Sequence, residues 1–192
     1  MNRKNKVQQI DKKKSKRREE LLWSLKLALI ACLISVVFSF ISEIAMKNVN
    51  ILIGTIVIIV FILIGILFDM VGVAVTSADE APLHAMSSKK VKGSKMAVNL
   101  KKNASKTSTF CCDVIGDICG IISGAAGVVV SNQITDIFNI SSILSSLIVT
   151  GIIAALTIGG KSVEKPIAIN NGNKILFEFS KIISIFSKNN GG

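Results

Sequence analysis

Four long apolar runs dominate the chain, separated by short polar links and one long basic loop. The runs cover residues 21–42, 48–68, 110–135 and 137–160. Each is long enough to cross a bilayer core as a helix, which takes about 20 residues. The second and fourth runs carry no charge, and the first carries only Lys26, whose long side chain can reach the membrane surface. The pattern predicts an all-α integral membrane protein with four transmembrane helices.

Two segments outside these runs mix apolar residues with lysines. In the loop 77–109 the two kinds alternate, and after the turn signal Asn170-Asn171-Gly172 the apolar residues fall on one helical face. We expect amphipathic juxtamembrane helices in both places. The chain then divides into a basic tail (1–20), an N-terminal transmembrane helix (21–45) and a main transmembrane domain (48–190) with spans at about 48–76, 110–135 and 137–160.

The basic residues predict the orientation of these helices. Nine lysines and arginines lie in residues 1–18, seven in the loop 77–109 and five after Gly160, whereas the two short opposite loops hold only Lys47. If all four helices span, every basic segment lies on one side, which the positive-inside rule makes cytoplasmic. We expect an integral protein of a bacterial plasma membrane with both termini in the cytoplasm.

The net charge of +11 follows from this topology and from attraction to anionic lipid headgroups. No aromatic stacking residues accompany the basic segments, so we expect the lipid bilayer as a partner and no nucleic acid. The sequence shows no nucleophile–base pair and no cofactor motif, and we expect no enzymatic activity.

Three carboxylates lie in or at the edge of apolar runs. Asp69 follows the second run, and Asp113 and Asp117 open the third, four residues apart and so on one helical face. Carboxylates at membrane depth are costly, and by default they indicate a functional site. The alternatives are a cation site and a set of structural salt bridges.

A stripe of glycines, Gly116, Gly120 and Gly124, adjoins the two aspartates. This spacing lets helices approach backbone to backbone. From the spacing alone, contacts within the chain are favoured over contacts between two chains.

Three segments together resemble the transmembrane domain of the CorB/CorC–cyclin M family of magnesium transporters. FDMVGVAVTSADEAPLHA (68–85) is similar to the family's F-S-x-S-E-T-A-L-T-S helix end. IGDICGIISGA (115–125) is similar to its I-G-N-x-x-x-N-I-x-x-S-A segment, and GKSVEKPIA (160–168) to its G-E-x-x-P-K-x-x-A segment. The resemblance covers roughly residues 50–186.

The resemblance implies a three-helix core that binds Mg²⁺ and pairs as a homodimer. The helix at 21–45 is additional to that core, and the family's cytosolic regulatory domains have no counterpart in these residues. In the family, oxygens of helix-end serines, of the Asn in the G-N pair and of the Glu in the G-E pair hold the ion.

The sequence departs from the family at these ion-binding positions. Asp69 and Val71 replace the serines, Asp117 replaces the Asn, Lys161 replaces the Glu, and Glu164 replaces the Pro of the third segment. In one interpretation Asp69, Asp117 and Asp113 bind a divalent cation, and a shifted register gives Glu164 a ligand role. In the alternative, Lys161 places its ammonium between Asp69 and Asp117 and fills the site, which leaves a non-transporting scaffold or partner subunit.

Overall fold

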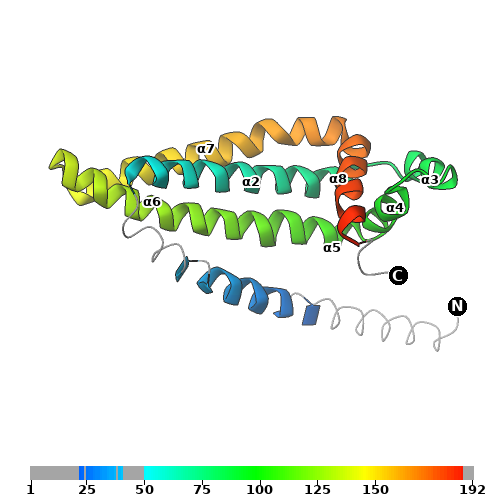
Figure 1. The fold of residues 1–192 in the computed structure, drawn as a ribbon, viewed down its shortest axis with the longest axis horizontal. Coiled ribbons are helices and arrows are strands. Elements are labelled where there is room, and N and C mark those ends of the chain that lie inside the picture. The colour runs from blue at the N-terminus through cyan, green and yellow to red at the C-terminus, as the bar shows by residue number, and fades with distance from the viewer. Residues whose placement is uncertain (1–21, 24, 38, 41–49, 188–192) are drawn as a thin grey trace, which may run out of the picture.

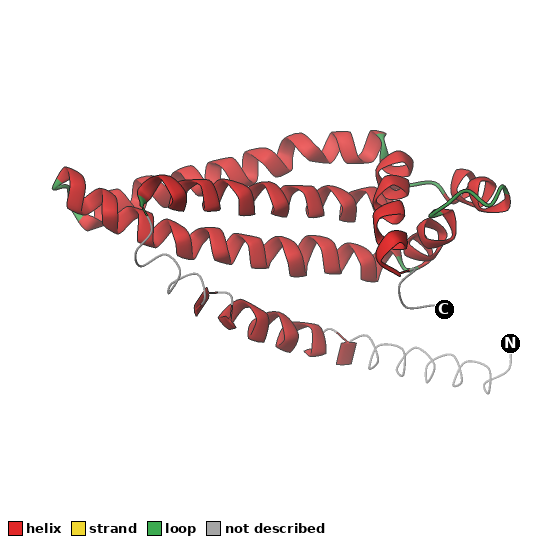
Figure 2. Ribbon diagram, in the orientation of Figure 1, coloured by secondary structure: helices red, strands yellow, loops and turns green. Residues whose placement is uncertain are grey.

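The computed structural model describes residues 22, 23, 25–37, 39, 40 and 50–187. This part of the chain is helical with short turns and contains no strand, as Figure 2 shows. The prediction of an all-α protein is therefore confirmed for the described residues.

Three long helices form a bundle (Figure 1). They are α2 (Ile51–Ser77), α6 (Gly116–Phe138) and α7 (Ser142–Asn170). Helix α6 continues a rod that begins with α5 (Ala104–Ser108) and passes through a short π-helix, η1 (Thr109–Ile115). All three units are long and apolar enough to cross a membrane. Large apolar side chains cover their outer faces, as expected for contact with lipid.

The boundaries of two helices differ from the predicted spans. The turn between α6 and α7 lies at residues 139–141, a few residues after the predicted break, because Asn139 adopts the left-handed conformation that ends a helix (φ 53°). Helix α7 continues ten residues beyond the predicted end at Gly160 and includes Pro166. It ends at Asn170, at the predicted turn.

The predicted fourth span is not confirmed. Within 21–45 the structure describes a shorter apolar helix, Leu25–Val37, here called the N-terminal apolar helix. The predicted tail 1–20 lies outside the described residues, as do 41–49 and the end of the predicted domain at 188–190.

Four shorter helices gather at one end of the bundle, here called the capped end. They are α3 (Glu80–Ser88), α4 (Ser94–Lys102), α5 and α8 (Gly172–Ser187), and α8 crosses the bundle axis in Figure 1. Their shared core with α2 includes the fully buried side chains of Val75, Leu83 and Leu176. Helices form in the segments where amphipathic helices were predicted, but that they are amphipathic and lie on a membrane surface stays a prediction.

Polar contacts fix the capped end to the bundle. The Lys101 ammonium donates hydrogen bonds to the carbonyls of Val75 (3.2 Å) and Thr76 (2.9 Å) in the last turn of α2. These carbonyls have no partner within the helix, and a cation also opposes the negative end of the helix dipole. Lys101 therefore caps the C-terminal end of α2.

Two glycines allow the bundle helices to pack closely against one another. A Cβ atom at Gly65 on α2 would lie 3.2 Å from the Cβ of Cys119 on α6. A Cβ atom at Gly160 on α7 would overlap the side chain of Ile66 on α2. Larger residues at these two positions would push the helices apart.

Candidate functional site

The candidate site lies between α2, α7 and the start of α6, near the capped end. Asp69 on α2 is buried, with 6% of its surface exposed, although it carries a carboxylate. The ammonium Nζ of Lys161 on α7 lies 3.7 Å from its Oδ1 atom. The Lys161 side chain is 28% exposed, so the pair has access to solvent from the lysine side.

Glu164 brings a second carboxylate to the pair from the next turn of α7. It is 5% exposed, and neither of its carboxylate oxygens has a hydrogen-bond partner. Its main side-chain neighbour is the carboxyl group of Asp69, with which it can share a hydrogen bond only when one of the two is protonated, and Lys165 and Lys161 follow. A buried carboxylate without a partner is costly, and native proteins rarely leave one in that state. Asp69, Lys161 and Glu164 are here called the three-helix site.

The start of α6 supplies the third wall of this site. A Cβ atom at Gly116 would lie 3.6 Å from Nζ of Lys161, so the absent side chain leaves room for the lysine. One turn earlier, the Cys112 thiol donates a hydrogen bond to the backbone carbonyl of Asp69 over 3.6 Å. Cys112 belongs to the π-helix η1, and such wide turns often occur at functional sites.

The charges of the three-helix site do not balance. When all three groups are ionised, two carboxylates and one ammonium leave one negative charge in a largely buried space. Carboxylate oxygens are the ligands that Mg²⁺ prefers, and Mg²⁺ usually keeps several waters and takes only one or two protein carboxylates. Asp69 and Glu164 therefore suit a partly hydrated cation, provided that Lys161 moves aside.

Asp113 and Asp117 do not join Asp69. Both are exposed, and both line a groove of 1040 Å³ between the N-terminal apolar helix and the start of α6. Across the described residues, no three His, Cys, Asp or Glu side chains are placed to hold a metal ion together. The set of Asp69, Asp117 and Asp113 is thus divided between two faces, and a metal-binding role for it stays a prediction.

The glycine stripe is divided in the same way. Gly116 is buried beside Lys161, whereas a Cβ atom at Gly120 or Gly124 would meet no atom within 4 Å. Within the described part of the chain, only Gly116 of the three lies at a helix contact. The face of Gly120 and Gly124 is open.

Glu164 has a larger part in this site than was predicted from the sequence. The sequence placed it as a ligand only if the third motif shifts its register. The signal was its position three residues after Lys161, which puts both side chains on one face of a helix.

No family model matches the chain, and neither a curated protein nor a solved structure matches it. The fold and the site thus define a helical protein with three helices suited to a membrane and a charged cluster between them. The resemblance to the CorB/CorC–cyclin M family rests on the three sequence segments.

Proposed function

We propose that the protein binds a cation at the three-helix site and is a divalent-cation transporter of the Mg²⁺ type, similar to the CorB/CorC–cyclin M transmembrane domain. The observation that carries this proposal is the Glu164 carboxylate, which is buried with both oxygens unpartnered next to the Asp69–Lys161 pair. A cation between Asp69 and Glu164 gives both carboxylates a partner.

Lys161 competes with that cation. Its ammonium neutralises Asp69 when the cation is away, and its flexible four-carbon stem and partial exposure let it withdraw when the cation enters. Binding and release of the ion then exchange the single charge of the ammonium for the double charge of the cation, and the site is never left with two uncompensated carboxylates.

The family resemblance supports the same location. The three segments that carry it meet at this site, because Asp69 comes from the first, Gly116 from the second, and Lys161 and Glu164 from the third. These segments are far apart in the sequence, yet Lys161 lies within 4 Å of both Asp69 and the position where a Gly116 side chain would begin.

The second candidate function is a non-transporting scaffold or partner subunit in which Lys161 fills the site permanently. The observation that favours it is the Lys161–Asp69 distance of 3.7 Å. In this case the lysine is a structural counter-ion, and the site takes no ion from solution.

We also propose that the chain forms a homodimer in a bacterial plasma membrane, with the capped end in the cytoplasm. The open face at Gly120 and Gly124 supports pairing, because small residues favour close contact between membrane helices. The seven lysines of the loop 77–109 support the orientation.

The melting temperature of the purified protein in detergent, measured across a Mg²⁺ titration with Na⁺ and Ca²⁺ for comparison, separates the two functions. A ligand that binds only the folded state raises stability with the logarithm of its concentration above saturation. A Mg²⁺-dependent rise that Glu164→Gln removes, and that the surface variant Glu178→Gln keeps, supports cation binding. The absence of any response in the wild type and in Lys161→Gln contradicts it and favours the filled site.

A further inference from the structure

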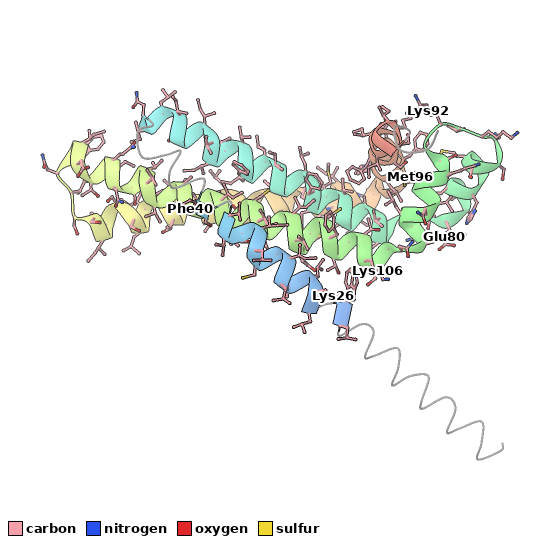
Figure 3. The ribbon with its side chains drawn as sticks, turned by 60° about the horizontal axis from the view of Figure 1, so that its bottom comes forward. Lys26, Phe40, Glu80, Lys92, Met96 and Lys106 are labelled. Carbon is pink, nitrogen blue, oxygen red and sulfur yellow. The ribbon has the colours of Figure 1, made fainter. Side chains whose placement is uncertain are left out.

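A second feature, separate from the three-helix site, is the groove between the N-terminal apolar helix and the rod of α5, η1 and α6. Its volume is 1040 Å³, at the upper limit of ligand sites in proteins. One wall comes from Trp23, Leu27 and Ala31, and the other from the start of α6. Figure 3 shows the N-terminal apolar helix running obliquely to the rod, with Lys106 near Lys26 at the beginning of that helix.

The deeper part of the groove is apolar. Small residues of the N-terminal apolar helix, such as Ala28 and Ala31, face Ile118 and Ile121 of α6 across it. In a bilayer, a space between two apolar helices is filled by lipid chains or by another apolar group.

The mouth of the groove carries both signs of charge. Asp113 and Asp117 line it with exposed carboxylates, and neither has a hydrogen-bond or ion-pair partner among the described residues. Lys106 lies at the same mouth, where its Nζ atom is 5.8 Å from the centre of the Trp23 ring. No carboxylate in the described part of the chain pairs with Lys106.

We propose that this groove binds one aminophospholipid of the phosphatidylethanolamine type. Its ammonium group bonds to Asp113 and Asp117, and its acyl chains follow the apolar wall. Charge complementarity makes the groove selective for this lipid, because an anionic lipid has no cationic group to pair with the two aspartates. The quaternary ammonium of phosphatidylcholine has no N–H to donate to them.

Trp23 provides a direct test, because it is the single tryptophan of a chain that has no tyrosine. The full-length protein is reconstituted in vesicles with increasing fractions of phosphatidylethanolamine, phosphatidylcholine or phosphatidylglycerol whose acyl chains are brominated, and quenching of Trp23 fluorescence is measured. We expect half-maximal quenching at about a tenfold lower fraction of the ethanolamine lipid, the effect of one charged hydrogen bond.

The variant Asp113→Asn/Asp117→Asn is expected to lose this preference, whereas Asp136→Asn, outside the groove, keeps it. Equal quenching by the three lipids in the wild type overturns the proposal, as does a preference that survives the double substitution. Both outcomes are independent of Mg²⁺ binding at the three-helix site, so the two proposals can fail separately.

Discussion

The ammonium of Lys161 lies 3.7 Å from a carboxylate oxygen of Asp69, while Glu164, three residues later on the same helix, has no partner for either oxygen. One lysine therefore faces two buried carboxylates and compensates one of them. A second buried carboxyl group without a counter-charge of its own distinguishes this cluster from a closed structural salt bridge, in which every buried charge has its counterpart.

Replacing Glu164 by glutamine is expected to stabilise the protein in buffer without divalent cations. The substitution keeps the shape of the side chain and removes a buried acidic group that lacks a counter-charge of its own, and the free energy of unfolding in detergent should rise by about 1–3 kcal/mol. The exposed Glu178, paired with Lys181 at 2.9 Å, provides the matched control, and Glu178→Gln should change stability by less than about 1 kcal/mol. A destabilised Glu164→Gln would mean that Glu164 is already compensated.

Replacing Lys161 by glutamine is expected to lower the free energy of unfolding in buffer without divalent cations. It is also expected to strengthen cation binding. Loss of the ammonium leaves two carboxylates together, and removing one partner of a buried pair costs about 3 kcal/mol or more. Added Mg²⁺ should recover stability in this variant at lower concentrations than in the wild type, because the competitor is gone. The control is Lys174→Gln, an exposed position on α8. A variant that Mg²⁺ fails to rescue would indicate a purely structural lysine.

Two glycine substitutions separate contacts inside the chain from contacts between chains. Gly160→Leu places a side chain against Ile66 and should destabilise the monomer by about 1–3 kcal/mol through overpacking. A Cβ atom at Gly120 would meet no atom of a neighbouring element within 4 Å, so Gly120→Leu should leave monomer stability nearly unchanged and weaken the proposed dimer. Denaturant unfolding and light scattering in detergent measure the two effects. A Gly120→Leu variant that dimerises like the wild type would remove this face from the dimer proposal.

Loss of the Lys101 side chain is expected to loosen the capped end. Lys101→Ala leaves the carbonyls of Val75 and Thr76 without their donor, at a cost of about 1.5–3 kcal/mol for hydrogen bonds to a charged group. Lys102→Ala is the neighbouring control, since Lys102 is exposed and has no such contact. Hydrogen exchange of the last turn of α2 measures the change, and equal exchange in the two variants would contradict the capping role.

The length of the apolar runs was enough to predict the three bundle helices, because the signal extends over about 20 residues. Their ends were harder to predict. The turn after α6 depends on the left-handed backbone of Asn139. The extension of α7 beyond Gly160 depends on contacts at the capped end, where the Ser77 hydroxyl hydrogen-bonds the Ala168 carbonyl at 3.3 Å. Neither the backbone conformation of Asn139 nor the hydrogen bond between Ser77 and Ala168 produces a periodic pattern in the sequence.

The arrangement of the charged residues was predicted only in part. The alternative interpretation placed the Lys161 ammonium between Asp69 and Asp117. The structure brings Lys161 to Asp69, whereas Asp117 lines the groove beside the N-terminal apolar helix. The sequence also placed Asp113 and Asp117 on one face correctly, but helical spacing does not say which neighbour that face meets. The π-helix η1 lies directly before α6 and widens the turn there, which changes the faces on which its residues lie.

Mg²⁺ binding by isothermal titration calorimetry tests the central claim, competition between Lys161 and a cation for Asp69 and Glu164, most directly. The wild type, Lys161→Gln and Lys161→Gln/Glu164→Gln are titrated in the same detergent. The account predicts tighter binding in Lys161→Gln than in the wild type and loss of binding in the double variant. Equal affinity in all three proteins, or no binding in Lys161→Gln, would contradict it.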